Sequence, residues 1–293
     1  CLKRAVGAWG RTAAGFMGLA ALRSLGKPPK RVVMNIHWDN PYRALWRGRR
    51  PMLKAVDEAD LDTPPLESLL GIERQKAALL DNLRRFTHGQ PANHTLLWGA
   101  RGCGKSSLAK AAFGALRHEG LRLVQIDKDD LLDLPDLADE LRHQPQRFMV
   151  FCDDLSFQVG DPAFRALKTI LDGSIERAPD NILLVTTSNR RHLVPERMTD
   201  NQTASYVDGE LHLGDAVEEQ MALADRFGLW LSFYPPDQDT FLAMVAGRGV
   251  ALDAQVRLEA VRFATTRGGR SGRAARQFGQ SRDNSRDNDG QDV

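Results

Sequence analysis

The sequence predicts an α/β fold in which a five-stranded parallel sheet is flanked by helices and followed by a small helical lid. Strand-like and helical patterns alternate through the middle of the chain, which is typical of layered α/β domains. The strand-like segments are unbroken apolar runs, as expected when helices cover both faces of a parallel sheet. Beyond Pro235 and Pro236 the strand pattern stops and only helical patterns follow, so the lid is predicted to be all helical.

The predicted elements follow one another in a regular order. A helix at 74–86 comes first, and the predicted strands are 95–98, 121–126, 147–152, 181–187 and 229–234. The helices between these strands are predicted at 105–117, 131–141, 162–175 and 216–226. The lid helices are predicted at 238–246, 253–265 and 271–278.

A glycine-rich turn follows the first predicted strand. Residues 99–106 match G-x-x-x-x-G-K-[ST] at every fixed position. Its glycines let the backbone bend tightly and point N–H groups at a bound phosphate, at the start of the next helix. Lys105 would add charge at the β and γ oxygens, and the Ser106 hydroxyl would ligate Mg²⁺. The predicted nucleotide contacts of the turn are Gly99, Ala100, Arg101, Gly102, Cys103, Gly104, Lys105, Ser106 and Ser107. An ordinary glycine-rich turn is the competing interpretation.

Two acidic residues end the third predicted strand. Mg²⁺ needs a second ligand from a carboxylate at the C-terminal end of a neighbouring strand, where ligands collect in open α/β sheets. Asp153 takes that position, and Asp154 is expected to point the other way and orient the attacking water. The alternative is that Asp153 only caps the following turn.

Other candidates rest on weaker patterns. Asn189 ends the fourth predicted strand, where its amide would hold the attacking water unless it is a simple turn residue. The apolar patch of Leu70, Gly71 and Ile72 fits the cover of an adenine ring and fits ordinary core equally well. Arg226 precedes the fifth strand and is a candidate to complete the site of a neighbouring subunit.

The end of the lid is rich in arginine. No acidic residue separates Arg262, Arg267, Arg270, Arg273 and Arg276. A role in sensing phosphate competes here with a solvated basic face.

Charge is divided between two unlike parts of the chain. Residues 1–54 hold twelve Lys or Arg and one acid, Asp39, whereas the rest holds 28 basic and 37 acidic residues. The acidic body argues against a general nucleic-acid binder. The basic stretch fits an organellar targeting segment, a membrane-surface or nucleic-acid arm, or a solvated leader, and we favour the last.

These patterns divide the chain into four predicted parts: a basic N-terminal arm, poorly ordered in part, at 1–55, the nucleotide-binding domain at 56–235, the lid at 236–278 and a disordered tail at 279–293. The tail is polar and cannot bury enough apolar surface to fold. No apolar run is long enough to cross a bilayer, and three scattered cysteines form no disulfide framework. We therefore expect a cytoplasmic location.

The order of these motifs resembles the AAA+ ATPases over residues 60–278. By that resemblance 99–106 is Walker A, 148–154 is Walker B, Asn189 is sensor 1, Arg226 is the arginine finger and Arg273 is sensor 2. Arg270, one turn away, is the competing sensor 2. The segments FCDDLSF, TTSNRRHL and LADRFGLWLSFYPPDQDTF further resemble a bacterial family of predicted AAA+ ATPases, the domain of unknown function 815.

The resemblance implies an ATPase that uses ATP and Mg²⁺ to drive self-assembly, as an ATP-dependent homo-oligomer, or remodelling of a protein client. Its implied catalytic residues are Lys105, Asp154, Asn189, Arg226 and Arg273, and its implied metal ligands are Ser106 and Asp153. Walker B ends in Asp154 where most AAA+ proteins have Glu, which implies slower turnover. The alternative is an ATP-gated loader or adaptor for nucleic acid or a partner protein, with little turnover.

Overall fold

The computed structural model describes Trp38 and residues 43–47, 52–157, 161–172, 177–189, 205–207, 210–212 and 226–289. The chain divides into two compact units, Cys1–Val33 and Met34–Val293, and every described residue belongs to the second.

Five parallel strands form the centre of the sheet, which confirms the predicted α/β fold. They are β3 (Thr95–Gly99), β4 (Leu121–Gln125), β5 (Arg147–Cys152), β6 (Ile182–Ser188) and β9 (Leu229–Phe233). Their spatial order is β4-β5-β6-β3-β9, and every neighbouring pair is parallel. Strand β3 therefore lies between β6 and β9, and its C-terminal end opens on the edge of the sheet where ligands collect in such folds.

Two further strands enlarge the sheet beyond the prediction. Strand β1 (Arg43–Arg47) is parallel to β4, and β2 (Met52–Val56) is antiparallel to β1 at the outer edge. Both lie mainly in the range predicted as a basic arm. The buried Trp38 ring meets Phe148 edge to face at 4.8 Å, and Arg122 Nε donates a hydrogen bond of 2.6 Å to the Trp38 carbonyl oxygen. These contacts hold the start of this segment against the sheet.

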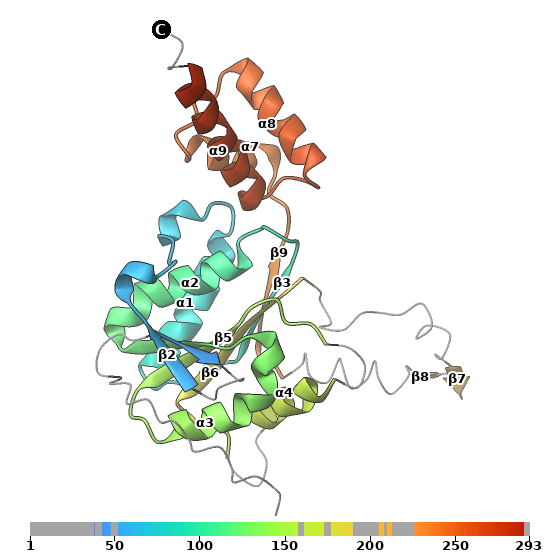
Figure 1. The fold of residues 1–293 in the computed structure, drawn as a ribbon. Helices are drawn as coiled ribbons and strands as arrows, with labels where there is room; N and C mark the ends of the chain where they lie inside the picture. The colour runs from blue at the N-terminus through green and yellow to red at the C-terminus, as the bar shows by residue number, and fades with distance from the viewer. Residues whose placement is uncertain are drawn as a thin grey trace, which may run out of the picture. The chain divides into compact units, whose positions relative to one another are not determined.

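The helices cover both faces of the sheet (Figure 1). One hydrophobic cluster includes α1 (Glu73–Thr87) and α2 (Lys105–Leu116), and a second includes α3 (Leu134–Arg142) and α4 (Pro162–Asp172). Along β5, Phe148 and Val150 belong to the second cluster, whereas Met149 and Phe151 belong to the first. Because side chains alternate between the two faces of a strand, coverage on both sides requires the unbroken apolar run seen in the sequence.

The lid has a hydrophobic core of its own. It consists of α7 (Gln238–Ala246), α8 (Ala254–Thr266) and α9 (Gly272–Asp289), which pack around residues such as Phe241, Ala260 and Phe278. Helix α9 continues to Asp289, so residues 279–289 differ from the predicted disordered tail. The physical reason is that Arg282 forms an ion pair with Glu259 of α8, which anchors the polar end of the helix. No helix among the described residues is long and apolar enough to span a membrane.

Some predicted elements lie outside the described residues. The predicted helix at 216–226 does so except for Arg226, and the predicted helix at 162–175 is described only as far as Asp172. A short antiparallel hairpin of β7 (Ser205–Val207) and β8 (Glu210–His212) was not predicted. Its strands hold three residues each, too few for a periodic pattern to reveal.

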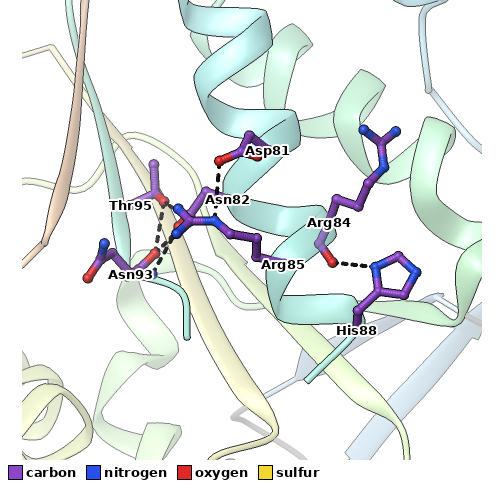
Figure 2. A network of polar contacts seen from close by, with 7 residues as sticks. All are labelled: Asp81, Asn82, Arg84, Arg85, His88, Asn93 and Thr95. Atoms are coloured by element: carbon purple, nitrogen blue, oxygen red, sulfur yellow. Dashed lines mark hydrogen bonds and ion pairs between the residues drawn. The ribbon is translucent and has the colours of Figure 1, made fainter. Parts of the chain in front are cut away.

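A buried asparagine joins α1 to the start of β3 (Figure 2). Asn82 is 1% exposed, and its Nδ2 donates hydrogen bonds to the Asn93 carbonyl oxygen at 2.8 Å and to Thr95 Oγ1 at 3.2 Å. Its Oδ1 accepts a hydrogen bond of 3.0 Å from the Asn93 backbone N–H. The strand that leads into the glycine-rich turn is thus fixed to a helix by one side chain.

We expect Asn82→Ala to lower the free energy of unfolding by about 1–3 kcal/mol, because it removes the three hydrogen bonds of the buried Asn82 amide and takes the side-chain acceptor from the Asn93 N–H. Urea denaturation measures this change. Asp81→Ala is the matched control on the same helix, since Asp81 makes an exposed ion pair of 3.2 Å with Arg85 and should cost less than about 1 kcal/mol. Equal losses in the two variants would contradict a special role for Asn82.

A second polar contact at β3 is sensitive to pH. Leu184 N–H donates a hydrogen bond of 3.0 Å to His94 Nδ1, and burial lowers the pKa of His94 to about 4. Because the unfolded chain binds the proton near pH 6.5, the contribution of His94 is fully present above that pH. It is lost as the pH falls from about 6.5 to about 4.

We expect His94→Asn, whose Oδ1 can accept the same hydrogen bond, to lose less stability than the unmodified protein between pH 7 and pH 4. The difference should reach about 3 kcal/mol at pH 4. Urea denaturation across this range measures the free energy of unfolding of both proteins. The difference between the two values at each pH removes the contribution of other titrating groups. Parallel curves would show that His94 does not titrate in the expected way.

Candidate functional site

The glycine-rich turn joins β3 to α2 as its sequence pattern predicts. Gly99 ends the strand at φ 130°, and a Cβ there would lie 2.1 Å from the Phe233 carbonyl oxygen of β9. Gly104 precedes α2 at φ 97°, in the left-handed region that favours glycine. The first N–H groups of α2 therefore face the cavity that the turn encloses.

The ammonium of Lys105 lies inside this turn. Lys105 is 6% exposed, and its Nζ donates hydrogen bonds to the carbonyl oxygens of Gly99 at 2.8 Å and Ala100 at 2.9 Å. A third donated bond of 3.0 Å reaches Asn189 Oδ1. Burial lowers the pKa of Lys105, and the charges of Asp153 and Asp154 oppose that shift. The three acceptors and two nearby carboxylates thus hold a cation at the phosphate end of the cavity.

Two oxygen donors for a divalent cation meet across the strand ends. Ser106 Oγ donates a hydrogen bond of 2.6 Å to Asp153 Oδ1. Neighbouring oxygens around octahedral Mg²⁺, each about 2.0–2.1 Å from the ion, lie at a similar mutual distance. Among the described residues no three His, Cys, Asp or Glu side chains gather as a metal cluster. Ser106 and Asp153 therefore fit an ion whose remaining ligands come from phosphate and water.

The second acid of the pair has a different set of contacts. Asp154 has φ 55° and is the one described non-glycine residue with a positive φ. Its Oδ1 accepts a hydrogen bond of 2.5 Å from Asn189 Nδ2. Asp153 and Asp154 thus face different partners, as the sequence pattern predicts. Thr187, which the sequence patterns did not single out, contacts both acids from β6.

These groups line one cavity of about 730 Å³. The predicted site residues that line it are Leu70, Ile72, Arg101, Gly102, Cys103, Gly104, Lys105, Ser106, Ser107, Asp153, Asp154, Asn189 and Arg273. Gly71, Gly99 and Ala100 adjoin these lining residues in the chain. Arg226 does not line the cavity and forms an ion pair with Asp172 at the end of α4.

The apolar patch at one end of the cavity serves two purposes. Leu70 and Ile72 line the cavity, and Ile72 also belongs to the hydrophobic core under α1 and α2. Gly71 has φ 76°, and a Cβ there would lie 2.7 Å from Thr240 Cγ2 of α7. Adenine cover and ordinary core were alternatives in the sequence, and the geometry is compatible with both at once.

The lid presents arginines to the cavity. Arg273 and Arg276 of α9 line it together with Arg248, whereas Arg270 does not. Instead, Arg270 Nε donates a hydrogen bond of 3.0 Å to the Pro236 carbonyl oxygen. The geometry therefore favours Arg273 of the two sensor 2 candidates. Arg248 was missed because it stands alone after α7, with no basic neighbour in the sequence.

The cavity carries excess positive charge. Among the described residues, Lys105 and the arginines 101, 248, 273 and 276 line it, against three carboxylates from Glu67, Asp153 and Asp154, for a formal charge of +2. Such a cavity favours an anionic ligand.

The two described cysteines are buried and free. Burial raises the pKa of Cys103, and it raises the pKa of Cys152 to about 12. Both side chains are therefore thiols near neutral pH and pack as small apolar groups, the role that the sequence favours for them.

Comparisons with known proteins agree with this geometry. A family model described as "Protein of unknown function (DUF815)" matches residues 40–285. No curated protein sequence matches the chain.

Solved structures show the same fold at low sequence identity. A point mutant of RuvB from Thermotoga maritima superimposes with a TM-score of 0.51 at 19% identity, covering 75% of this chain and 66% of RuvB. The ORC1 protein of Aeropyrum pernix, solved in complex with DNA, gives a TM-score of 0.50 at 15% identity, covering 73% and 58%. This chain spans less than two thirds of RuvB and of ORC1, so the likeness shows the fold alone. That fold is the one of the AAA+ ATPases.

Proposed function

The chain belongs to the DUF815 family and has the AAA+ fold, and on this premise we propose that it binds MgATP and hydrolyses it to drive self-assembly or the remodelling of a protein client. The observation that carries the proposal is the contact between Ser106 and Asp153 beside the buried ammonium of Lys105. This contact supports a cation site beside a phosphate site in one cavity.

Charge supports a nucleoside triphosphate in particular. The side chains that line the cavity sum to +2, and a triphosphate nucleotide with four negative charges and one Mg²⁺ carries −2. The diphosphate complex would carry −1 and leave the cavity with excess charge. The three apolar side chains of Leu69, Leu70 and Ile72 in the lining suit a planar base.

Each residue has one task in this proposal. Lys105 would exchange its bonds to the turn carbonyls for β- and γ-phosphate oxygens. Ser106 and Asp153 would hold Mg²⁺, which would supply positive charge beside those oxygens. Asp154 accepts a hydrogen bond from the attacking water and the Asn189 amide fixes its position. Arg273 approaches the γ-phosphate from the lid. A displacement of this kind depends on positioning and electrostatics rather than on a covalent intermediate.

The place of Arg226 supports assembly. It lies outside the cavity of its own chain, so a role in hydrolysis would require the site of a neighbouring copy. An arginine supplied in this way stabilises charge on the transferred phosphoryl group. A homo-oligomer formed in the presence of ATP is therefore part of the proposal.

A second candidate is an ATP-gated loader or adaptor with little turnover. It is favoured by the short carboxylate of Asp154, and by the basic residues that precede Trp38, as an arm for nucleic acid. Turnover with and without single- or double-stranded DNA, together with size-exclusion chromatography in an ATP analogue, separates the candidates. The buried free thiols of Cys103 and Cys152 support a reducing compartment such as the cytoplasm for either one.

We expect Lys105→Ala to weaken ATP binding by about 100-fold or more, because it removes the cation that faces the β- and γ-phosphates. Fluorescence anisotropy with a labelled ATP analogue measures the dissociation constant. Lys110→Ala is the control on the same helix, since Lys110 pairs with Asp62 at 2.8 Å and does not line the cavity. Tight ATP binding by Lys105→Ala would refute the proposed site.

We expect Arg226→Ala to bind ATP normally and to lose hydrolysis by about 1,000-fold, the loss typical of an arginine supplied by a neighbour. A mixture with Lys105→Ala subunits should regain part of the turnover, because those subunits supply Arg226. Asp172→Ala breaks the same ion pair but keeps the arginine, and it should remain active. Wild-type turnover by Arg226→Ala would exclude this role.

A further inference from the structure

One side chain outside the predicted site contacts both acids of the β5 end. Thr187 is 1% exposed, and its Oγ1 donates a hydrogen bond of 2.5 Å to Asp153 Oδ1. The same oxygen accepts a hydrogen bond of 2.8 Å from the Asp154 backbone N–H. The Thr187 carbonyl oxygen accepts a third bond, of 2.7 Å, from the Leu155 N–H. Three consecutive residues are thus bound to one threonine.

The backbone that Thr187 holds is strained. Asp154 has φ 55°, a region that costs a non-glycine residue free energy and persists only where the surroundings fix it. The bond from the Asp154 N–H to Thr187 Oγ1 is one such restraint. Because the chain turns at this point, Asp153 can face Ser106 while Asp154 faces Asn189.

The hydroxyl also orients the carboxylate of Asp153. Asp153 Oδ1 accepts hydrogen bonds from two hydroxyls, Ser106 Oγ at 2.6 Å and Thr187 Oγ1 at 2.5 Å. Ser106 lies in the first turn of α2, directly after the glycine-rich turn, whereas Thr187 lies on β6, an interior strand of the sheet. Thr187 therefore fixes the carboxylate independently of the turn.

The neighbouring threonine provides a contrast. Thr186 is also fully buried on β6, but its Oγ1 has no hydrogen-bond partner among the described residues. Successive side chains of a strand point to opposite faces, so only one of the two can reach the acids. Thr186 and Thr187 thus share their residue type, their strand and their burial. They differ in that only Thr187 contacts the two acids.

We infer that Thr187 is a positioning residue, which holds Asp153 and Asp154 in their divergent orientations and so presets the metal ligand and the water-orienting carboxylate. Thr187 lines the same cavity, and it acts through the two acids that its hydroxyl contacts. The consequence for metal binding rests on the function proposed above, whereas the consequence for the backbone does not.

The first test uses the nucleotide-free protein. Hydrogen exchange of the Asp154 amide should accelerate about 10-fold in Thr187→Val, the factor expected for one lost buried hydrogen bond. The Leu155 amide keeps its bond to the Thr187 carbonyl oxygen and serves as the internal reference. Thr187→Ser keeps the hydroxyl and should exchange like the wild type. Thr186→Val is the matched control and should also leave both amides unchanged. If the valine variant does not fold, Thr187→Ala replaces it, since alanine removes the hydroxyl without placing a methyl group against the carboxylate.

The second test measures the Mg²⁺ concentration that half-saturates binding of a fluorescent ATP analogue. Loss of a residue that orients a metal ligand typically costs about 10- to 100-fold in metal affinity, so Thr187→Val should raise this concentration by about that factor. Binding without Mg²⁺ should not change, and Thr187→Ser should restore the wild-type value.

The outcomes separate the two proposals. A wild-type protein that binds no nucleotide would overturn the proposed function, and the exchange measurement would still decide whether Thr187 fixes the turn. Unchanged exchange in Thr187→Val, or an equal effect in Thr186→Val, would overturn the role of Thr187. Faster exchange with an unchanged Mg²⁺ requirement would overturn its link to the metal ligand and reduce it to a structural residue.

Discussion

The contact between Ser106 Oγ and Asp153 Oδ1 joins two parts of the fold that are far apart in the sequence. Ser106 begins α2 after the glycine-rich turn, and Asp153 follows β5, two strands away from β3 in the sheet. Strand β6 lies between β5 and β3 and pairs with both, so the C-terminal ends of the three strands are adjacent. Thr187 of β6 donates a hydrogen bond to Asp153 at this edge. Metal binding, orientation of water and the position of Lys105 all depend on this alignment in the proposed function.

The sheet and the lid contribute different chemistry to the same cavity. The sheet edge supplies groups at fixed positions, because they lie at the ends of hydrogen-bonded strands. The lid supplies arginines on α9, whose reach depends on how the lid rests on the turn. Arg273 donates its backbone N–H to the Gly102 carbonyl oxygen at 3.4 Å, so the lid touches the turn through the main chain as well. The cavity therefore combines carboxylates fixed by the sheet with arginines carried by a separate helical unit.

Features that follow from local rules could be predicted from the sequence, whereas those that depend on distant contacts could not. The five parallel strands appear as apolar runs because both of their faces are buried, and the glycine-rich turn is a contiguous motif. Strands β1 and β2 were missed because their short segments mix apolar with charged residues at the sheet edge. Thr187 was missed because only strand register distinguishes it from Thr186. The choice between Arg270 and Arg273 depends on where α9 begins, which is at Gly272. Arg273 lies inside the helix and lines the cavity, whereas Arg270 precedes the helix and bonds to Pro236 before α7.

Strand β9 connects two regions that the site needs to coordinate. Arg226, the residue proposed to act on a neighbour, precedes it, and the lid follows it after Pro235 and Pro236. Between these ends β9 pairs with β3 along its whole length, from Thr95↔Leu229 to Gly99↔Phe233. A paired strand does not stretch, so β9 behaves as a short rigid rod. In the proposed assembly, a displacement at Arg226 would therefore reach the base of the lid along β9 rather than through the cavity.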